Sequence, residues 1–302
     1  MKYTCCERLM WHIIAPASLR YLSKRGWDAP SLKKKAKMIY RQIVKRTPNI
    51  GGLTGNSLHI CLVAGMIWLP IYEAAEGKMG YRSLGKEATF YDGMITCSTL
   101  PGRVICGLVW NMGQEKNTRY LEKALDRIPD GFSGKLLEVP VGTGVLTIPV
   151  YKTLPKADIT CLDYSPDMMV TAQRRAKVAG LKNVTFQQGD VGALPFGDGA
   201  FDLVLSLNGF HAFPDKEAAY HEIYRVLRPG GIFCGCFYVK GENRRTDWFI
   251  KKIYTPKGFF TPPYETVGSL RDRLAGQYEQ VTMETVEAMA CFTAKKSESK
   301  EN

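Results

Sequence analysis

The sequence lacks a hydrophobic stretch long enough to cross a lipid bilayer. The apolar run Leu58–Tyr72 has 15 residues and is interrupted by His59, whereas a membrane-spanning helix needs about 20. This length favours a buried helix that packs on a neighbouring helix or across a homodimer contact. The chain also shows no convincing signal peptide, which favours a cytoplasmic protein.

Cysteine pairs with the spacing of a metal site are also absent. Among the nine cysteines, Cys5 and Cys6 are adjacent, while Cys234 and Cys236 alternate along a predicted strand. Alternate residues of a strand face the same side of a sheet, so we expect the second pair to lie in the core. We expect the thiols to be reduced, as is usual in the cytoplasm, and no metal to be bound.

Acidic residues are scarce in the first 80 positions. Residues 1–80 contain 13 Lys plus Arg against 4 Asp plus Glu, whereas residues 81–302 contain 28 against 25. Within this part, residues 31–46 place Leu, Ile and Val at helical spacing among Lys and Arg, which predicts a basic amphipathic helix. Such a helix forms a solvated face, which the pattern favours, or lies on an anionic membrane surface, or contacts nucleic acid. We therefore divide the chain into a basic helical N-terminal extension, residues 1–80, and a domain of residues 81–302.

The chain does contain a strand that runs directly into a turn of small residues. Residues 136–144 read LLEVPVGTG, in which an apolar strand ends at Glu138 and the turn opens a helix. Glycines let the backbone approach a ligand closely, and the first amides of the helix face a polar group. A pyrophosphate site would need a third glycine after Gly144, and Pro140 removes a backbone donor. A cofactor with ribose and adenine but without phosphates fits this turn better.

Three further strand-like runs follow, and each ends at a polar or acidic residue. They are Ile159–Asp163, Val184–Asp190 and Phe201–Ser206. In a doubly wound sheet the ligand sits outside the carboxyl ends of parallel strands, so these residues would point into one crevice. Asp163 lies 25 residues beyond Glu138, a spacing that brings a carboxylate to ribose hydroxyls. The sequence therefore predicts an α/β fold with a doubly wound, mostly parallel sheet.

These motifs resemble those of the class I S-adenosylmethionine-dependent methyltransferases, most nearly the small-molecule group that includes the ubiquinone and menaquinone C-methyltransferases. The resemblance covers residues 90–296. Its glycine motif appears as Glu138-Val139-Pro140-Val141-Gly142-Thr143-Gly144, with proline in place of the first glycine. The resemblance implies a Rossmann-like sheet of seven strands, S-adenosyl-L-methionine as cofactor, and methyl transfer to a small, apolar or aromatic acceptor by direct displacement.

The resemblance also implies a set of cofactor-binding residues. By the family pattern, Asp163 would hold the ribose hydroxyls and Met168 would flank the adenine. Asp190 would receive the adenine amino group with Val191 packed beside it, and Tyr91, in a helix before the sheet, would close over the methionine end. The complete expected set is Tyr91, Glu138, Pro140, Gly142, Gly144, Asp163, Tyr164, Met168, Asp190, Val191 and Asn208.

His211 follows the fourth predicted strand and is the expected catalytic residue. An imidazole with a pKa near neutrality suits a general base, should the acceptor be a hydroxyl or an activated ring carbon. A packing role is the alternative, because this family often places a histidine there. Displacement at a sulfonium methyl chiefly requires that the nucleophile be aligned within about 3–3.5 Å.

Residues 239–268 are rich in aromatic side chains. Such a loop would expose apolar surface unless it covers something, so we predict a lid over the acceptor. Arg244 and Arg245 would be available for an anionic group. The aromatic residues are Trp248, Phe249, Tyr254, Phe259, Phe260 and Tyr264.

Two functions of other classes stay open. The basic N-terminal part is compatible with a nucleic-acid methyltransferase or binder, although nothing else in the sequence favours that partner. A catalytically silent methyltransferase fold that binds a partner is the second alternative, and the combination of Gly142, Gly144, Asp163 and Asp190 disfavours it.

Overall fold

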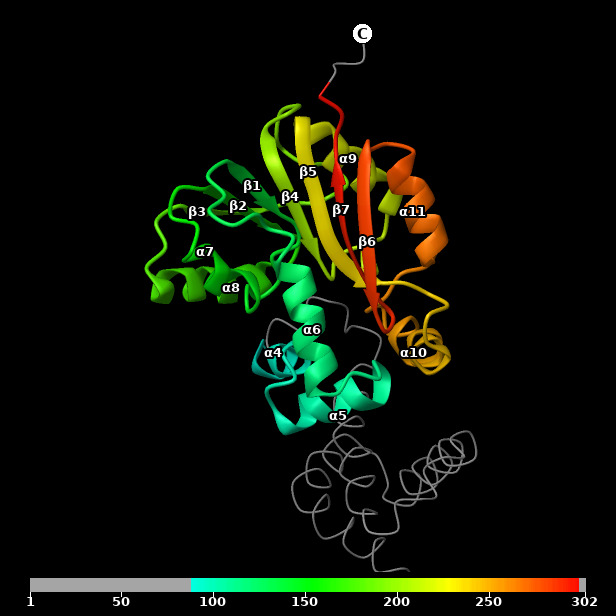
Figure 1. The fold of residues 1–302 in the computed structure, drawn as a ribbon. Coiled ribbons are helices and arrows are strands. Elements are labelled where there is room, and N and C mark those ends of the chain that lie inside the picture. The colour runs from blue at the N-terminus through cyan, green and yellow to red at the C-terminus, as the bar shows by residue number, and fades with distance from the viewer. Residues whose placement is uncertain (1–87, 299–302) are drawn as a thin grey trace, which may run out of the picture. The chain divides into compact units, whose positions relative to one another are not determined.

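The computed structural model of the protein describes residues 88–298, with the side chains described from residue 91 on (Figure 1). These residues lie within residues 77–302, the second of two units into which the chain divides. The expected extension of residues 1–80, its basic helix 31–46 and the apolar run 58–72 fall outside the described residues.

A seven-stranded sheet forms the centre of the described part, in the order β3-β2-β1-β4-β5-β7-β6. The first five of these strands are parallel, and β7 runs antiparallel to both β5 and β6. The predicted doubly wound, mostly parallel sheet is therefore confirmed. The strands are β1 (Lys135–Glu138), β2 (Asp158–Asp163), β3 (Val184–Gln188), β4 (Phe201–Leu207), β5 (Leu227–Tyr238), β6 (Gln280–Val286) and β7 (Met289–Lys295).

The register of the parallel strands brings their carboxyl ends to one edge of the sheet. Glu138, the last residue of β1, pairs with Cys161 of β2 and Leu205 of β4, and Asp163 pairs with Gln188 of β3. Figure 1 shows the arrowheads of β4 and β5 pointing toward the end of the sheet where α4, α6 and α10 lie. Ligand-binding crevices of doubly wound sheets occur at this edge.

Helices cover both faces of the sheet. Side chains of α6, α7 and α8 pack in one apolar cluster against one face, and those of α9 and α11 pack in a second cluster against the other. The helices are α4 (Ala88–Ile95), α5 (Leu100–Val109), α6 (Gln114–Leu125), α7 (Thr147–Tyr151), α8 (Pro166–Ala179), α9 (Lys216–Val226), α10 (Arg244–Phe249), the π-helix η4 (Ile250–Tyr254) and α11 (Val267–Ala275).

Local sequence explains where the helix beside the glycine turn begins and ends. Ser165 caps α8 by accepting a hydrogen bond from Met168 N, and Pro166 occupies the first turn, where a missing N–H costs nothing. Gly180 ends the helix in the left-handed region, with φ 74°. The predicted core position of Cys234 and Cys236 is also confirmed, because both are fully buried in β5.

Candidate functional site

The turn after β1 shapes a cavity at the carboxyl edge of the sheet. Gly142 and Gly144 adopt φ values of 55° and 67°, which disfavour any side chain. A Cβ atom on Gly144 would also lie 2.7 Å from Cγ1 of Ile148. The cavity, which is partly open to solvent, contains about 420 Å³ of empty space. It is lined by Tyr91, Ile95, Glu138, Pro140, Val141, Gly142, Thr143, Gly144, Val145, Leu146, Thr147, Leu207 and Asn208.

The described lining residues carry an acidic group but no basic side chain. Glu138 is the one ionisable acid, and no Lys or Arg occurs among the described residues that line the cavity. A nucleotide phosphate would therefore find no cationic side chain here. A cationic ligand would face a carboxyl group.

Glu138 is held in place by three donors. Its Oε2 accepts hydrogen bonds from Tyr151 OH at 2.7 Å, Thr147 Oγ1 at 3.1 Å and Cys161 Sγ at 3.6 Å. Burial of the side chain raises the pKa of Glu138 from 4.5 to about 8, against the lowering effect of these hydrogen bonds. The carboxyl group is therefore largely protonated at neutral pH when the cavity holds no cation.

Asp163 stabilises the turn by accepting hydrogen bonds from backbone N–H groups. Its Oδ2 accepts a hydrogen bond from Gly142 N at 2.7 Å, and its Oδ1 accepts one from Ser165 N at 2.8 Å. Burial raises the pKa of Asp163, and the backbone donors oppose that rise. Asp163 thus fixes the turn to the start of α8 and is not itself among the residues that line the cavity.

Asn208 lies at the end of β4 in an unusual backbone conformation. Its φ is 56°, a value rare for residues other than glycine. Its backbone N donates to Cys236 O at 2.7 Å, and its Oδ1 accepts from Tyr120 OH at 3.1 Å. The structure thus gives this cavity residue a partner on α6 that the sequence motifs do not indicate.

Helix α4 is tied to the glycine turn by a second group that the motifs missed. Asp92 accepts a hydrogen bond from Thr143 Oγ1 at 2.6 Å and forms an ion pair with Arg175 of α8. Arg175 also donates to Thr143 O at 2.6 Å. These contacts hold α4, and with it Tyr91 and Ile95, against the turn. A single aspartate next to Tyr91 carries no sequence signal of this contact.

The residues expected around the adenine lie beside the cavity and are not among its lining residues. Met168 is fully buried and Val191 is 6% exposed, whereas Tyr164 is 57% exposed. Asp190 accepts a hydrogen bond from Gly192 N at 2.8 Å. The structure therefore brings Tyr91, Glu138, Pro140, Gly142, Gly144 and Asn208 together around the cavity, and leaves Asp163, Tyr164, Met168, Asp190 and Val191 at the neighbouring ends of β2 and β3.

His211 is buried away from this cavity. Its ring stacks on Phe260, with centroids 4.0 Å apart and an interplanar angle of 8°, and its Nδ1 has no hydrogen-bond partner. Burial, and then the charge of Lys216, lower the pKa of His211 to about 3. His211 lies instead in a closely packed group with Phe210, Lys216, Phe237, Tyr238, Tyr264 and Glu265. The imidazole is therefore neutral throughout the physiological pH range.

The aromatic segment 239–268 is not the loop that the sequence predicted. It includes α10 and η4, and Ile250 and Phe260 are buried at 1% and 5% exposure. Trp110, at the end of α5, contacts the rings of Tyr238, Tyr254 and Phe260 with centroids 6.1 to 6.3 Å apart. The aromatic side chains cover one another and Trp110, which removes the apolar exposure that suggested a lid.

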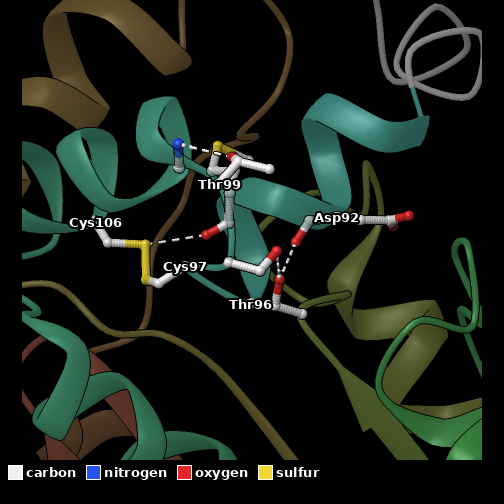
Figure 2. Close-up of a disulfide and its surroundings, with 8 residues drawn as sticks. Asp92, Thr96, Cys97, Thr99 and Cys106 are labelled. Carbon is white, nitrogen blue, oxygen red and sulfur yellow. Dashed lines mark hydrogen bonds between the residues drawn. A yellow bond between two sulfur atoms is a disulfide. The ribbon is translucent and has the colours of Figure 1, made fainter.

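A disulfide contradicts the expectation that all thiols are reduced. Cys97, between α4 and α5, is bonded to Cys106 of α5 (Figure 2). The free cysteines of the described residues, Cys161, Cys234, Cys236 and Cys291, are all buried. The expectation failed because composition and spacing carry no information on how α5 folds back onto the end of α4.

The described residues contain neither a metal-binding cluster nor a membrane-spanning helix. Residues 88–298 contain no group of three or more His, Cys, Asp or Glu that could hold a metal ion. None of the helices in this range combines the length and the apolar character required to cross a membrane.

Comparison with known proteins shows what part of this chain is similar to. Residues 136–231 match the family described as Methyltransferase domain. The chain is 40% identical over 113 residues to a demethylmenaquinone methyltransferase of Thermus thermophilus, covering 37% of this chain and 51% of that protein. It is 36% identical over 110 residues to the enzyme of the same name from Lactococcus lactis, covering 36% and 44%. The chain thus spans about half the length of these curated relatives.

Solved structures show the same fold. The [4+2]-cyclase SpnF superposes with a TM-score of 0.52 at 19% identity, covering 72% of this chain and 96% of that one. At this identity the likeness concerns the fold alone. Chemistry has to be argued from the residues of the site.

Proposed function

We propose that this chain carries a class I methyltransferase domain, and that it transfers a methyl group from S-adenosylmethionine to a small quinol-type acceptor. The domain family implies the cofactor. The quinol-type acceptor is suggested by the demethylmenaquinone methyltransferases that the chain resembles. The single observation that carries the proposal is the cavity at the glycine turn, whose described lining residues include a buried carboxyl group and no Lys or Arg.

The residues of the cavity fit this cofactor. S-adenosylmethionine carries sulfonium, ammonium and carboxylate groups but no phosphate. Among the described residues that line the cavity, Glu138 has the one carboxyl group, and no Lys or Arg occurs. The positive φ of Gly142, with no atom within 4 Å of where its Cβ would lie, leaves open space against the backbone of the turn. When bound, the cofactor would supply a methyl group on a positively charged sulfur.

The remaining expected residues take supporting roles in the proposal. Tyr91 and Asn208 would close the cavity at the methionine end, and Pro140 would shape the turn. Asp163 would bind the ribose while the hydrogen bond that it accepts from Gly142 N holds the turn in its conformation. The adenine would lie among Tyr164, Met168, Asp190 and Val191.

The protein's part in transfer is alignment and exclusion of water. The acceptor would donate an electron pair to the methyl carbon as the carbon–sulfur bond breaks and its electrons pass to sulfur. Because the leaving group is already cationic, holding the nucleophile in line within about 3–3.5 Å is the main requirement. The apolar walls formed by Ile95, Val141 and Leu207 suit an aromatic acceptor.

His211 is the proposed base for an acceptor hydroxyl, on the condition that Phe260 moves off its ring. The Nδ1 atom is buried without a hydrogen-bond partner, and burial lowers the pKa of His211 to about 3, so the ring would act as a base only once the packing around it opens. We expect His211→Ala to lower turnover by about 10²-fold or more while changing cofactor affinity little. Turnover equal to that of the native chain would assign His211 to packing.

Calorimetric titration tests the proposed function directly. The full chain is titrated with S-adenosylmethionine and with S-adenosylhomocysteine, its demethylated product. We expect Asp163→Ala to weaken binding of both by about tenfold or more, because it removes the carboxylate that holds Gly142 N. Asp158→Ala is the matched control, since Asp158 is exposed at the opposite end of the same strand.

The outcomes separate the classes of function. Binding that weakens in Asp163→Ala but not in Asp158→Ala supports the cofactor site and justifies a screen of quinols, phenols and other small acceptors. Absence of binding by the native chain would contradict the proposal and favour a catalytically silent module.

A further inference from the structure

Tyr120 of α6 is buried directly behind the cavity. It is 4% exposed, and its hydroxyl oxygen lies 3.1 Å from Asn208 Oδ1 and 3.2 Å from Cys236 Sγ. Neither Tyr120 nor Cys236 lines the cavity. Asn208 does, so Tyr120 can act on a ligand there only through Asn208.

The direction of these hydrogen bonds follows from the number of protons. A tyrosine hydroxyl has one hydrogen to donate, and a carbonyl oxygen is a much stronger acceptor than a thiol sulfur. Tyr120 OH therefore donates to Asn208 Oδ1, and the Cys236 thiol donates to the Tyr120 oxygen. With its oxygen engaged in this way, the side-chain amide of Asn208 has its N–H hydrogens left for other acceptors.

The backbone of Asn208 is held in one conformation. Its φ of 56° and the hydrogen bond from its N to Cys236 O fix the position of its Cα atom. The orientation of the amide then depends on rotation about the side-chain bonds. The Tyr120 hydroxyl is the contact that selects one orientation.

The two threonine hydroxyls around the cavity are already committed. Thr143 Oγ1 donates to Asp92, and Thr147 Oγ1 donates to Glu138. Of the described residues that line the cavity, Asn208 is the one whose side chain carries N–H donors. With no Lys or Arg among the described lining residues, a carboxylate in this cavity would be held by neutral donors, namely backbone N–H groups of the turn and the side-chain amide of Asn208.

We propose that Tyr120 is a positioning residue, which orients the Asn208 amide so that its N–H donates to the carboxylate of the cofactor's amino acid part. This inference rests on the proposed function, because it takes S-adenosylmethionine and its product as the ligands. It adds α6, a helix outside the sequence motifs, to the determinants of cofactor affinity.

A pair of ligands isolates this contact. S-adenosylhomocysteine contains the carboxylate, whereas 5′-methylthioadenosine contains the same adenosine and sulfur without the amino acid part. In the full chain, Tyr120→Phe should raise the Kd of S-adenosylhomocysteine roughly threefold to tenfold. The Kd of 5′-methylthioadenosine should stay at the native value.

A matched control removes a buried tyrosine hydroxyl elsewhere. Tyr278 is 5% exposed and its hydroxyl has no hydrogen-bond partner, so Tyr278→Phe should leave both Kd values unchanged. An equal loss of affinity for both ligands in Tyr120→Phe, or no loss, would overturn the proposal. If instead the native chain binds neither ligand, the proposed function itself fails.

Two variants of Asn208 show whether Tyr120 acts through it. Asn208→Gly accommodates the positive φ but lacks the amide, and adding Tyr120→Phe to it should cause no further loss of S-adenosylhomocysteine affinity. Asn208→Asp replaces the donor by an acceptor and should weaken S-adenosylhomocysteine selectively. Should Tyr120→Phe not fold, native affinity in Asn208→Asp would overturn the proposal.

Discussion

The carboxyl group of Glu138 combines deep burial with a position on the cavity wall. Burial raises its pKa to about 8, while the hydroxyls of Tyr151 and Thr147 partly offset that effect. The folded protein therefore holds a proton there that the unfolded chain releases near its ordinary pKa of 4.5. A ligand with a positive charge would reverse this preference, because it favours the ionised carboxylate.

Glu138 makes the stability of the ligand-free protein depend on pH. Because the folded state binds the extra proton between its unfolded pKa of 4.5 and its folded pKa of about 8, the free energy of unfolding should fall as pH rises through this window. The check is thermal unfolding of the full chain from pH 5 to pH 9. Glu138→Gln, which cannot titrate, should show a smaller decline, and equal slopes would contradict the assigned pKa.

Single residues also show what sequence can and cannot predict. The glycines of the turn and the acids at strand ends follow from local pattern, because backbone geometry demands glycine and strand ends define the crevice. Asp92, Arg175 and Tyr120 act through contacts between distant segments: Tyr120 lies 88 positions from Asn208. No local pattern encodes such a contact.

At the scale of elements, α4 and α5 form a closely packed pair beside the cavity. A Cβ atom on Gly102 would lie 1.8 Å from the carbonyl oxygen of Gly93, so the two helices meet backbone to backbone. Thr99 caps α5, and the disulfide between Cys97 and Cys106 closes the turn between them (Figure 2). The pair carries Tyr91 and Ile95 to the cavity wall.

Removing the disulfide should loosen this pair. Closing a loop of this length stabilises a protein by about 2–3 kcal/mol in the chain-entropy description. We expect the double variant Cys97→Ser and Cys106→Ser to show faster hydrogen exchange in α4 and α5, unchanged exchange in the central strands, and weaker binding of S-adenosylmethionine. A reductant should shift the native chain toward the variant and leave the variant unchanged. Identical exchange in both proteins would show that the disulfide adds no constraint.

The strands were easier to predict than the segments between them. Apolar runs ending in Asp163 and Glu138 specify buried parallel strands, because both faces of such strands are covered. The segment 239–268 misled the prediction, since its aromatic content indicates burial but not the partner. That partner is Trp110, more than a hundred positions earlier in the chain.

At the scale of the whole molecule, charge is divided unevenly along the chain. The net charge is +12, and residues 1–80 carry 13 Lys plus Arg against 4 Asp plus Glu. The parallel fold of the second part could be predicted because its motifs recur in order. The role of the first part could not, because a basic amphipathic pattern favours a solvated face but is also compatible with a membrane surface or nucleic acid.

A quinol acceptor dissolved in a membrane would give the basic segment a role at the membrane surface. In that case the full chain should cosediment with vesicles containing anionic lipid, less so at high salt and not with neutral vesicles. Lys33→Glu with Lys34→Glu should abolish binding, whereas the charge-matched control Lys152→Glu with Lys156→Glu, at exposed positions, should retain it. Equal binding by both double variants would exclude a specific contact through residues 31–46.

The contacts of Asp92 with Thr143 and Arg175 also affect the rate of the catalytic cycle. They hold α4 against one wall of the cavity, and a ligand that leaves past α4 would have to break them. The slow step of a catalytic cycle would then be the escape of spent cofactor, and a first turnover faster than all later ones would be its kinetic signature.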